Sequence, residues 1–190
     1  VDDYLHHTLI GQTLDDAIGE AFDKVARVVG LGYPGGPKID KEAKLGNYNL
    51  KFVKKSDLDK TYDFSYSGLK TAVINYLHKK EQAGEPVNVA DVACSFEHEA
   101  VDMLTDKVIR AAKEYKLNTI ALAGGVAANS YLRDTLTQKC NKAGIEITYP
   151  SLILCTDNGA MIGSMGYYNL INNEGICYDL SLSPNPSLKL

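Results

Sequence analysis

The sequence predicts an α/β protein, with a helix-rich part over residues 1–115 followed by a layer of strands and helices over residues 116–173. In the first part, apolar residues recur every three or four positions, which is the period of a helix that buries one face. In the second part, two short apolar runs each lead through a turn into a helical pattern, as in parallel sheets covered by helices. Residues 174–190 contain two prolines and one asparagine close together and are expected to be an irregular tail.

The first part is expected to contain four helices and one short strand. Thr13 and Asn88 suit helix caps, because their side chains accept hydrogen bonds from free backbone N–H groups. Residues 33–37 read Tyr-Pro-Gly-Gly-Pro, which predicts a rigid turn. Alternating apolar and polar residues over 49–55 favour a strand. The predicted helices are 13–29, 39–45, 69–80 and 89–115.

The second part is expected to alternate two strands with two helices. The first strand runs into a pair of glycines, and the second runs into a polar loop, so both lead directly to a turn before a helix. Ligands of α/β proteins bind at such strand ends. The predicted strands are 119–123 and 145–149, and the predicted helices are 127–143 and 158–172.

The bulk composition is that of an ordinary globular protein, with 45% hydrophobic and 23% charged residues. The net charge of −4 argues against a protein that binds mainly through phosphate contacts, since such proteins are usually more basic. The four cysteines form no Cys-x-x-Cys pair, and no apolar run approaches the ~20 residues of a membrane span. We therefore expect a cytoplasmic protein with reduced thiols that does not act in a membrane.

Four charged residues, Asp16, Glu20, Asp23 and Arg27, are spaced by four, three and four in the first predicted helix and would share one face of it. Gly19 lies beside this stripe and leaves room for another group to approach the backbone. Three carboxylates in a row repel one another, and a sugar with paired hydroxyls or a metal ion would relieve that repulsion. A solvated acidic face with basic residues nearby is the alternative, and charged helix faces are common.

The segment Gly-Gly-Val-Ala-Ala-Asn that begins at Gly124 follows the first predicted strand and opens a helix. Gly124 and Gly125 expose bare backbone, and the helix start offers free N–H groups to an anion or a base edge. Asn129 is expected in the first turn, where its amide suits a purine or a ribose. The segment matches neither the Walker loop nor the dinucleotide fingerprint, and glycines used only for close packing are the alternative.

Asp157 follows the second predicted strand and stands just before a helix. A carboxylate at this place is either a helix cap or a ligand for a cation. Cys155 is expected to be a small buried residue rather than a reactive thiolate. The four histidines show neither His-x-x-x-His nor His-Glu-x-x-His spacing, so a self-contained zinc protease is not expected. No residue stands out as a nucleophile or general base, and the catalytic residues stay unassigned.

Five segments together resemble one family, the tRNA threonylcarbamoyladenosine transferases, long described as O-sialoglycoprotein endopeptidases. The resemblance extends from about Gly11 to Gly166, and only the C-terminal half of the family is covered. The matching segments are Gly11–Lys24 with its Gly-Gln-Thr-x-Asp-Asp-Ala start, Tyr33–Pro37, Asp63–Thr71, Ala123–Asn129 and Cys155–Ile162.

The resemblance implies the C-terminal half of an actin-like ATPase fold, of the ribonuclease H-like class (ASKHA), with an additional helical region. It implies transfer of a threonylcarbamoyl group from threonylcarbamoyl-AMP to the adenine beside the anticodon of tRNAs that read ANN codons. The implied partners are tRNA and companion proteins of a threonylcarbamoylation complex. The implied cofactors are one iron or zinc ion and an adenine nucleotide, either threonylcarbamoyl-AMP or ATP/ADP.

The resemblance also implies roles for particular residues. Asp23 matches the family's ribose ligand, Gly36 and Asn129 match its other adenosine contacts, and Asp40 falls at a polar position near the ligand. Asp157 matches the carboxylate that ligates the metal. Glu20, Gly124 and Gly125 join the expected nucleotide site because of the acidic stripe and the glycine turn.

The chain departs from the family pattern because it lacks the family's His-x-x-x-His metal ligands and its Ser-Gly-Gly-His phosphate loop. One carboxylate does not hold a metal tightly, since such sites take three or more protein ligands. The isolated chain is therefore expected to be an inactive fragment of an active transferase. Two alternatives are a metal-dependent glycoprotein endopeptidase and a non-catalytic module for nucleotide binding or assembly.

Overall fold

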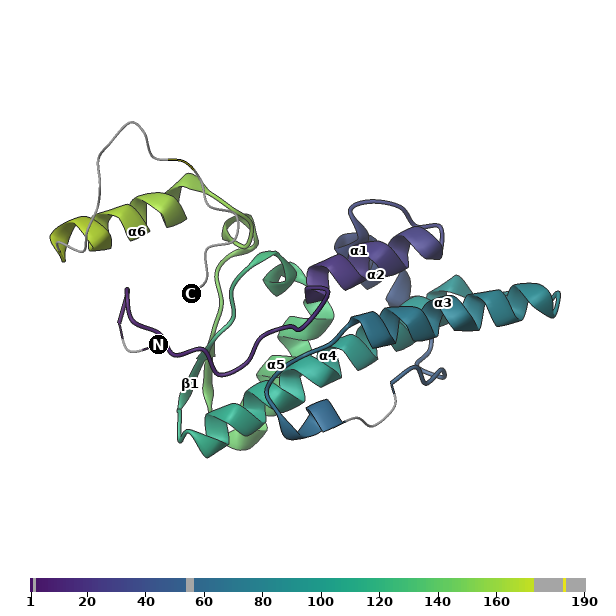
Figure 1. Ribbon diagram of the computed structural model, residues 1–190, viewed down its shortest axis with the longest axis horizontal. Coiled ribbons are helices and arrows are strands. Elements are labelled where there is room, and N and C mark those ends of the chain that lie inside the picture. Colours follow the sequence, from purple (N-terminus) through teal and green to yellow (C-terminus); the bar gives the residue numbers. More distant parts are fainter. Residues whose placement is uncertain (2, 54–56, 173–182, 184–190) are drawn as a thin grey trace.

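The structure is a computed structural model that describes residues 1, 3–53, 57–172 and 183. Over these residues the chain is mostly helical and contains one small parallel sheet, which confirms the α/β class (Figure 1). The elements are α1 (Ile18–Val28), α2 (Gly35–Ala43), η1 (Asp57–Lys60), α3 (Ser67–Gln82), α4 (Val89–Glu114), β1 (Thr119–Ala121), η2 (Gly125–Ala128), α5 (Ser130–Ala143), β2 (Glu146–Thr148), η3 (Leu152–Leu154) and α6 (Gly159–Ile171).

Helix α4 is the central element, and α1, α2, α3 and α5 all pack against it (Figure 1). Its N-terminal half forms the main hydrophobic core with α1, α2 and α3. Phe22 of α1 and Phe96 of α4 are almost fully buried there, and their rings meet edge to face at 5.0 Å between centroids. Asn88 caps α4 as predicted, since its side-chain oxygen accepts from the backbone N–H groups of Ala90 and Asp91.

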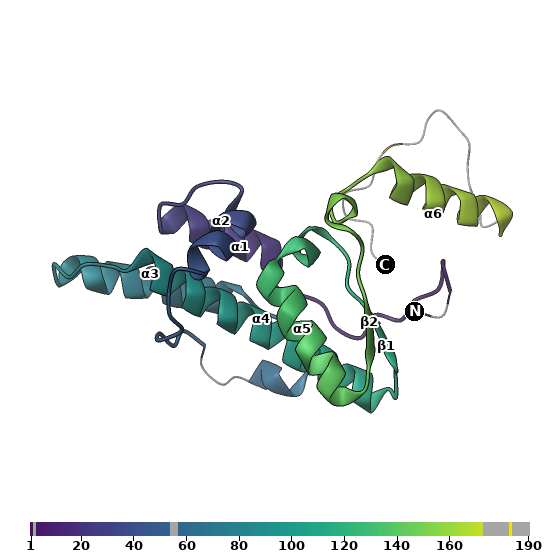
Figure 2. The ribbon, with the colours of Figure 1, turned by 180° about the vertical axis from the view of Figure 1, so that it is seen from behind.

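A second, smaller core lies between the C-terminal half of α4, helix α5 and the sheet. The strands β1 and β2 are parallel and pair Thr119 with Glu146 and Ile120 with Ile147. Helix α5 connects them and lies beside the sheet (Figure 2). Ile120 and Ile147 pack toward this core, whereas the residues on either side of them in both strands are exposed. One face of the sheet is therefore covered and the other is open.

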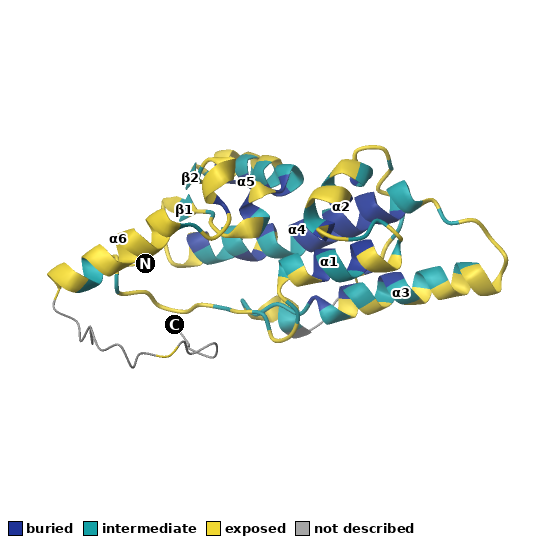
Figure 3. Ribbon diagram, turned by 90° about the horizontal axis from the view of Figure 1, so that it is seen from above, coloured by how far each residue is buried: buried dark blue, intermediate teal, exposed yellow. Residues whose placement is uncertain are grey.

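Helix α6 stands apart from both cores (Figure 3). None of its residues is buried, although many of them are apolar. It contacts the N-terminal segment through Tyr168, whose ring stacks on Tyr4 at 3.6 Å between centroids. Among the helices that the structure describes, none combines the length and apolar content that a membrane crossing requires.

The first helix begins five residues later than predicted. The segment before it is extended, because Thr13 pairs with Phe64 in an isolated parallel bridge and the backbone N–H of Leu14 donates to Phe64 O. Thr13 therefore does not cap α1, and its hydroxyl donates to the carbonyl of Asp16 instead. Asp16 lies outside the helix, so the predicted charged stripe on α1 is reduced to its last three members.

The predicted turn over residues 33–37 is also corrected, because its glycines already belong to α2. Proline is tolerated in the first turn of a helix, where its missing N–H is not needed. Pro37 therefore continues α2 rather than breaking it, and the helix starts four residues earlier than predicted. The tail, predicted to be irregular over 174–190, lies outside the described residues except for position 183.

Residues 49–53, predicted as part of a strand, do not form one. Their backbone N–H groups bond instead to side chains of α4. Leu50 donates to Ser95 Oγ at 3.1 Å, and the N–H groups of Phe52 and Val53 donate to Glu99 Oε2 at 2.8 and 2.7 Å. Buried backbone groups need partners, and here a carboxylate replaces a neighbouring strand. The rest of that predicted strand, residues 54 and 55, lies outside the described residues.

Candidate functional site

Three segments that are distant in the sequence meet at one place: the exposed side of α1, the start of α2, and the loop 124–129 with the start of α5. Gly19 allows the first contact, because a Cβ at this position would lie 3.1 Å from Val126 Cγ2. The space beside Gly19 is therefore filled by the loop 124–129, called the glycine loop below, and this contact holds η2 against α1.

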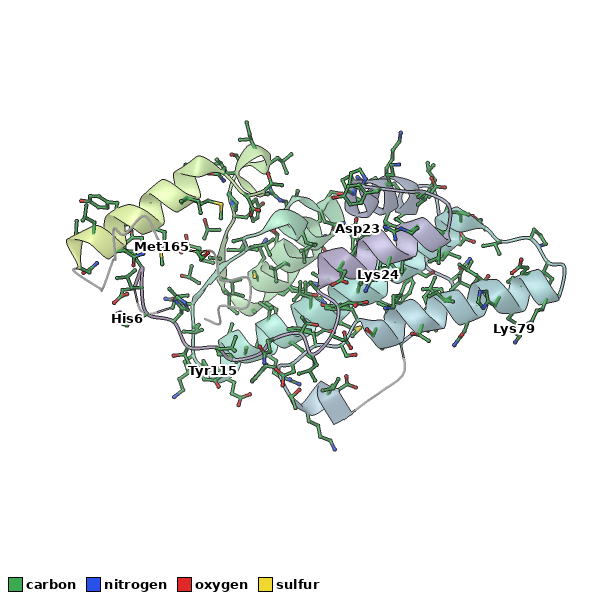
Figure 4. The ribbon with its side chains drawn as sticks, turned by 45° about the horizontal axis from the view of Figure 1, so that its top comes forward. His6, Asp23, Lys24, Lys79, Tyr115 and Met165 are labelled. Carbon is green, nitrogen blue, oxygen red and sulfur yellow. The ribbon has the colours of Figure 1, made fainter. Side chains whose placement is uncertain are left out.

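Asp23 connects α1 to the start of α2. Its Oδ1 accepts a hydrogen bond of 2.6 Å from the backbone N–H of Gly35, one of the N–H groups that α2 leaves without an intrahelical partner. In the part of the chain that the structure describes, the other oxygen, Oδ2, accepts no hydrogen bond. Asp23 is half-buried and lies on the α2 side of α1, as Figure 4 shows. Its free oxygen is therefore available to a ligand.

The two glycines at the start of α2 have different roles. A Cβ on Gly35 would come within 2.5 Å of the Asp23 Cα, so close packing excludes any side chain there. A Cβ on Gly36 would meet nothing within 4 Å. Gly35 is thus a packing residue, whereas Gly36 presents bare backbone to open space.

Gly124 and Gly125 are exposed and keep the loop before α5 narrow. Gly124 has φ of 87°, a conformation that side-chain-bearing residues rarely adopt. A Cβ on either glycine would meet no atom within 4 Å. Close packing therefore does not explain why both positions are glycine. The positive φ of Gly124 requires a glycine there, and Gly125 borders open space.

Asn129 caps α5 instead of lying in its first turn, which corrects the prediction. Its Oδ1 accepts from the N–H of Leu132 at 2.7 Å, and its Nδ2 donates to Glu97 Oε1 at 2.7 Å. The side chain is only 8% exposed. Because these two bonds fix the amide, one N–H of Asn129 remains for a purine or a ribose.

Sequence reasoning missed Glu97, which lies on α4 beneath Asn129 and is 2% exposed. Burial raises the pKa of Glu97 to about 7; the Asn129 hydrogen bond opposes the rise, and the charge of Asp40 adds to it. A signal was present in the sequence, because Glu97 stands four residues after Ala93 and three before Ala100 and so shares their buried helix face.

Asp40 of α2 reaches the start of α5. Its Oδ1 accepts from Ser130 Oγ at 2.6 Å, and its Oδ2 pairs with Lys44 at 3.3 Å. Ser130 follows Asn129 directly, so Asp40 and Glu97 both hold the start of α5 in place. The predicted set of Asp23, Asp40 and the glycines thus lies around one junction of helix starts, while the Asp40 oxygens already have partners.

The remaining acidic residues of the predicted stripe are balanced by lysines. Asp16 accepts hydrogen bonds from Lys24 and Lys70, both at 2.7 Å, and these two bonds hold the pKa of Asp16 below its usual range. Glu20 is exposed and pairs with Lys24 at 2.7 Å. Lys24 and Asp23 leave α1 on different sides (Figure 4). For Asp16 and Glu20, the alternative of a solvated, lysine-paired face fits the structure better than a ligand site.

Asp15 links two of the segments that resemble the family, Gly11–Lys24 and Asp63–Thr71. Its Oδ1 accepts from the backbone N–H groups of Tyr66 and Ser67, at 2.8 and 3.2 Å, and Ser65 Oγ donates to its Oδ2. Asp15 therefore caps α3 from a segment about fifty residues away. The role of this pairing is to hold α3 beside α1.

Asp157 is exposed and lies between η3 and α6. The cap of α6 is the next residue, because Asn158 Oδ1 accepts from the N–H of Met161 at 3.1 Å. The alternative that Asp157 caps the helix is therefore wrong. Cys155 is buried, as predicted. Within the described residues, no three His, Cys, Asp or Glu side chains come together in a way that could hold a metal ion.

These features define an α/β protein whose polar residues gather where helix starts and strand ends meet. Residues 1–164 match the family described as tRNA N6-adenosine threonylcarbamoyltransferase (TsaD), and the chain belongs to this family. Over 98% of its length it is 54% identical to a protein of Clostridium botulinum strain 657 with that name, and it covers 55% of that protein. A protein of Clostridium perfringens strain ATCC 13124 with the same name is 54% identical over the whole chain, which covers 56% of it.

The chain thus spans about half the length of the curated relatives it matches. Among solved structures, HypF of T. kodakarensis superposes on 82% of the chain with a TM-score of 0.61 and 20% sequence identity. The matched region is 20% of the HypF chain. At this identity the likeness concerns the fold alone.

Proposed function

We propose that this chain is the nucleotide-binding C-terminal part of an enzyme that transfers a threonylcarbamoyl group to the adenine beside the anticodon of ANN-reading tRNAs. Membership in the family, at 54% identity over almost the whole chain, carries this proposal. The donor is threonylcarbamoyl-AMP, and the partners are tRNA and companion proteins of the cytoplasmic threonylcarbamoylation machinery. In the reaction, the adenine amino nitrogen attacks the carbamoyl carbon and loses a proton, and AMP leaves with the oxygen that joined it to that carbon.

The proposed fold is the C-terminal half of an actin-like ATPase with an added helical region. The parallel pair β1–β2, connected through α5, supports the proposal, as does the likeness to a segment of HypF. In this arrangement, residues 1–115 form the adenosine-binding region and residues 116–173 the strand–helix layer. The remaining half of the enzyme is supplied by sequence outside this chain.

The adenosine is proposed to bind where the three segments meet. The free Asp23 oxygen suits a ribose hydroxyl, since a charged acceptor makes a strong hydrogen bond. The exposed backbone at Gly36, Gly124 and Gly125 allows flat approach of a base or sugar. The remaining Asn129 N–H suits a base or ribose acceptor. With these groups the protein contributes mainly position and orientation to the transfer.

Asp157 is proposed to give one ligand to an iron or zinc ion. Its exposed carboxylate fits that role, but a single carboxylate does not make a site, and the described residues include no group of three possible ligands. The other ligands would therefore come from the other half of the enzyme. In the full reading frame, meaning this chain with whatever its gene encodes before it, Asp157→Ala should lower metal content in elemental analysis. Unchanged metal content would contradict the assignment.

The test of the nucleotide site is calorimetric titration of ADP into the full reading frame and into this chain. Gly36→Ala adds a methyl group where the protein has no atom within 4 Å, so it should leave the fold intact and weaken ADP binding about tenfold or more. Gly68→Ala is the matched control, because Gly68 also lies in the first turn of a helix and its Cβ would meet nothing. Equal affinities of both variants and the unmodified protein would place the nucleotide elsewhere.

A further inference from the structure

Arg133, in the first turns of α5, contacts two loops at once. Its Nε donates to the carbonyl of Ala127 in the glycine loop. Its Nη2 donates to the carbonyl of Pro150 at 2.9 Å and to Cys155 Sγ at 3.1 Å, both in the loop that leads to Asp157. Its guanidinium carbon also lies 4.5 Å from the centroid of the Tyr149 ring.

A guanidinium is suited to such a connection. It is planar, permanently charged and carries donors that point in different directions, so it binds two carbonyls at a fixed mutual distance. A lysine ammonium carries the same charge on one nitrogen and does not fix this geometry. The Tyr149 ring adds a cation–π contact to one face of the group. Arg133 therefore fixes the distance between the glycine loop and the loop 149–157.

The loop 149–157 has few other attachments. Its backbone bonds run within the loop, from Leu154 N–H to Ser151 O and from Cys155 N–H to Leu152 O. Ile153 is 82% exposed, and the residues on either side of it are exposed as well. Asn158 Nδ2, at the cap of α6, donates to Thr156 O at 3.0 Å. Across the described residues, every other side-chain hydrogen bond that ties this loop to another element comes from Arg133. Cys155 is buried in the loop, 2% exposed, behind that contact.

We propose that Arg133 is a positioning residue that holds the Asp157 loop against the glycine loop and couples the two. The coupling rests on the proposed function, since it assumes that nucleotide binds at the glycine loop. A nucleotide that orders residues 124–129 then orders the Ala127 carbonyl, and through Arg133 it orders the loop two residues before Asp157. Because coupling between sites is reciprocal, a group held by Asp157 strengthens nucleotide binding by the same factor.

The alkylation rate of Cys155 measures whether Arg133 keeps this loop in place, because Arg133 Nη2 contacts its Sγ. In the full reading frame without nucleotide, the alkylation rate of each cysteine is measured by peptide mapping after iodoacetamide. Arg133→Ala should raise the rate at Cys155 at least tenfold while Cys94 and Cys140, buried in the two cores, stay protected. Arg27→Ala, at an exposed arginine of α1, should change none of these rates. A Cys155 that stays as protected in Arg133→Ala as in the unmodified protein overturns the proposal.

If Arg133→Ala exposes Cys94, Cys140 and Cys155 together, the variant has unfolded, and the Arg133→Lys variant is measured instead. Lysine keeps the positive charge but lacks the several donors of the planar guanidinium. Cys155 should therefore react several times faster than in the unmodified protein, while Cys94 and Cys140 should not. Unchanged Cys155 protection in Arg133→Lys overturns the need for a guanidinium, and with it the proposal.

The coupling is tested by adding ADP. In the unmodified protein ADP should slow alkylation of Cys155 several-fold, and in Arg133→Lys it should bind but give no such protection. Equal protection in both would mean that ADP shields Cys155 directly, and the coupling would be overturned. Failure of ADP to bind the unmodified protein would instead count against the proposed function, while the alkylation rates without nucleotide still decide whether Arg133 holds the loop.

Discussion

The helical region around the N-terminal half of α4 and the layer formed by β1, β2 and α6 differ in how they bury apolar residues. In the first, Phe22, Val25 and Phe96 are at most 1% exposed. In the second, Ile153 is 82% and Ile162 75% exposed, and one face of the sheet is open. The first region completes a core from its own residues, whereas the second leaves apolar surface that a folded protein normally covers.

This difference indicates that the two regions contribute unequally to stability. Burial of apolar surface is the main favourable contribution to folding, and it scales with the area removed from water. The free energy of unfolding should therefore depend on the helical region, while α6 should open at little cost. The candidate site spans both regions, because α1 and the start of α2 belong to the first region and Asp157 belongs to the second.

The largest expected effect comes from a matched pair of truncations, one in each region. Phe96→Ala should lower the free energy of unfolding by about 3–5 kcal/mol, because it leaves a cavity in a packed core. Ile162→Ala removes an exposed side chain and should change it by less than about 0.5 kcal/mol. Urea denaturation measures both. Similar losses in the two variants would show that α6 is packed against something in solution and would break the comparison.

The next effect concerns Glu97, the buried carboxyl of the helical region. Its pKa is raised from 4.5 to about 7, so the folded protein binds this proton more tightly than the unfolded chain. The stability associated with the neutral carboxyl is therefore complete below about pH 4.5 and is lost as the pH rises through about 7, by on the order of 3 kcal/mol. Unfolding free energies measured between pH 5 and 8 should show this decline.

Glu97→Gln is the control for that decline, because it keeps an acceptor for the Asn129 amide and removes the titration. The Gln variant should lose the downward slope between pH 5 and 8, whatever its absolute stability. Of the charged groups near Glu97, Asp40 on α2 raises its pKa and Lys44 lowers it. A slope that persists in the Gln variant would assign the titration to another group.

A smaller effect is expected at the cap that Asp15 supplies to α3. Asp15→Ala removes the acceptor of the Tyr66 and Ser67 N–H groups and should lower the free energy of unfolding by about 1–2 kcal/mol. Asp15→Asn keeps one acceptor oxygen and should lose less than half of that. Thermal or urea unfolding of both variants measures the difference. Equal losses would mean that the carboxylate charge, rather than the cap, stabilises α3.

Local sequence signals predicted the elements that depend on neighbouring residues. The apolar period gave α3, α4 and α5 within a few residues, and Asn88 marked the start of α4. The errors arise where distant residues determine the backbone. Thr13 is extended because it pairs with Phe64, and residues 49–53 are no strand because Ser95 and Glu99 take their N–H groups. No local pattern contains these partners.

The candidate site shows the same limit. Asp23, Gly36, Asp40 and the glycine pair were named from motifs, and the structure brings them to one junction. Glu97 and Arg133 were not named, since each acts on a residue or a loop that the sequence does not place beside it. The assigned ligand roles remain predictions. Family membership, which rests on whole motifs rather than on single contacts, was recognisable from the sequence and is confirmed.

The smallest expected effect sharpens the comparison most, because it uses the same residue type in both regions. Asn88 caps α4 and Asn158 caps α6, and in each case the side-chain oxygen accepts from backbone N–H groups of the first turn. Asn88→Ala should lower the free energy of unfolding by about 1 kcal/mol, the usual cost of a lost cap. Asn158→Ala should lower it by less than about 0.3 kcal/mol, since a helix without buried residues has little coupling to the cooperative core. Amide hydrogen exchange should nevertheless show faster exchange in α6 of that variant. Equal losses in the two variants would mean that α6 unfolds together with the core, and the two regions would then be one cooperative unit.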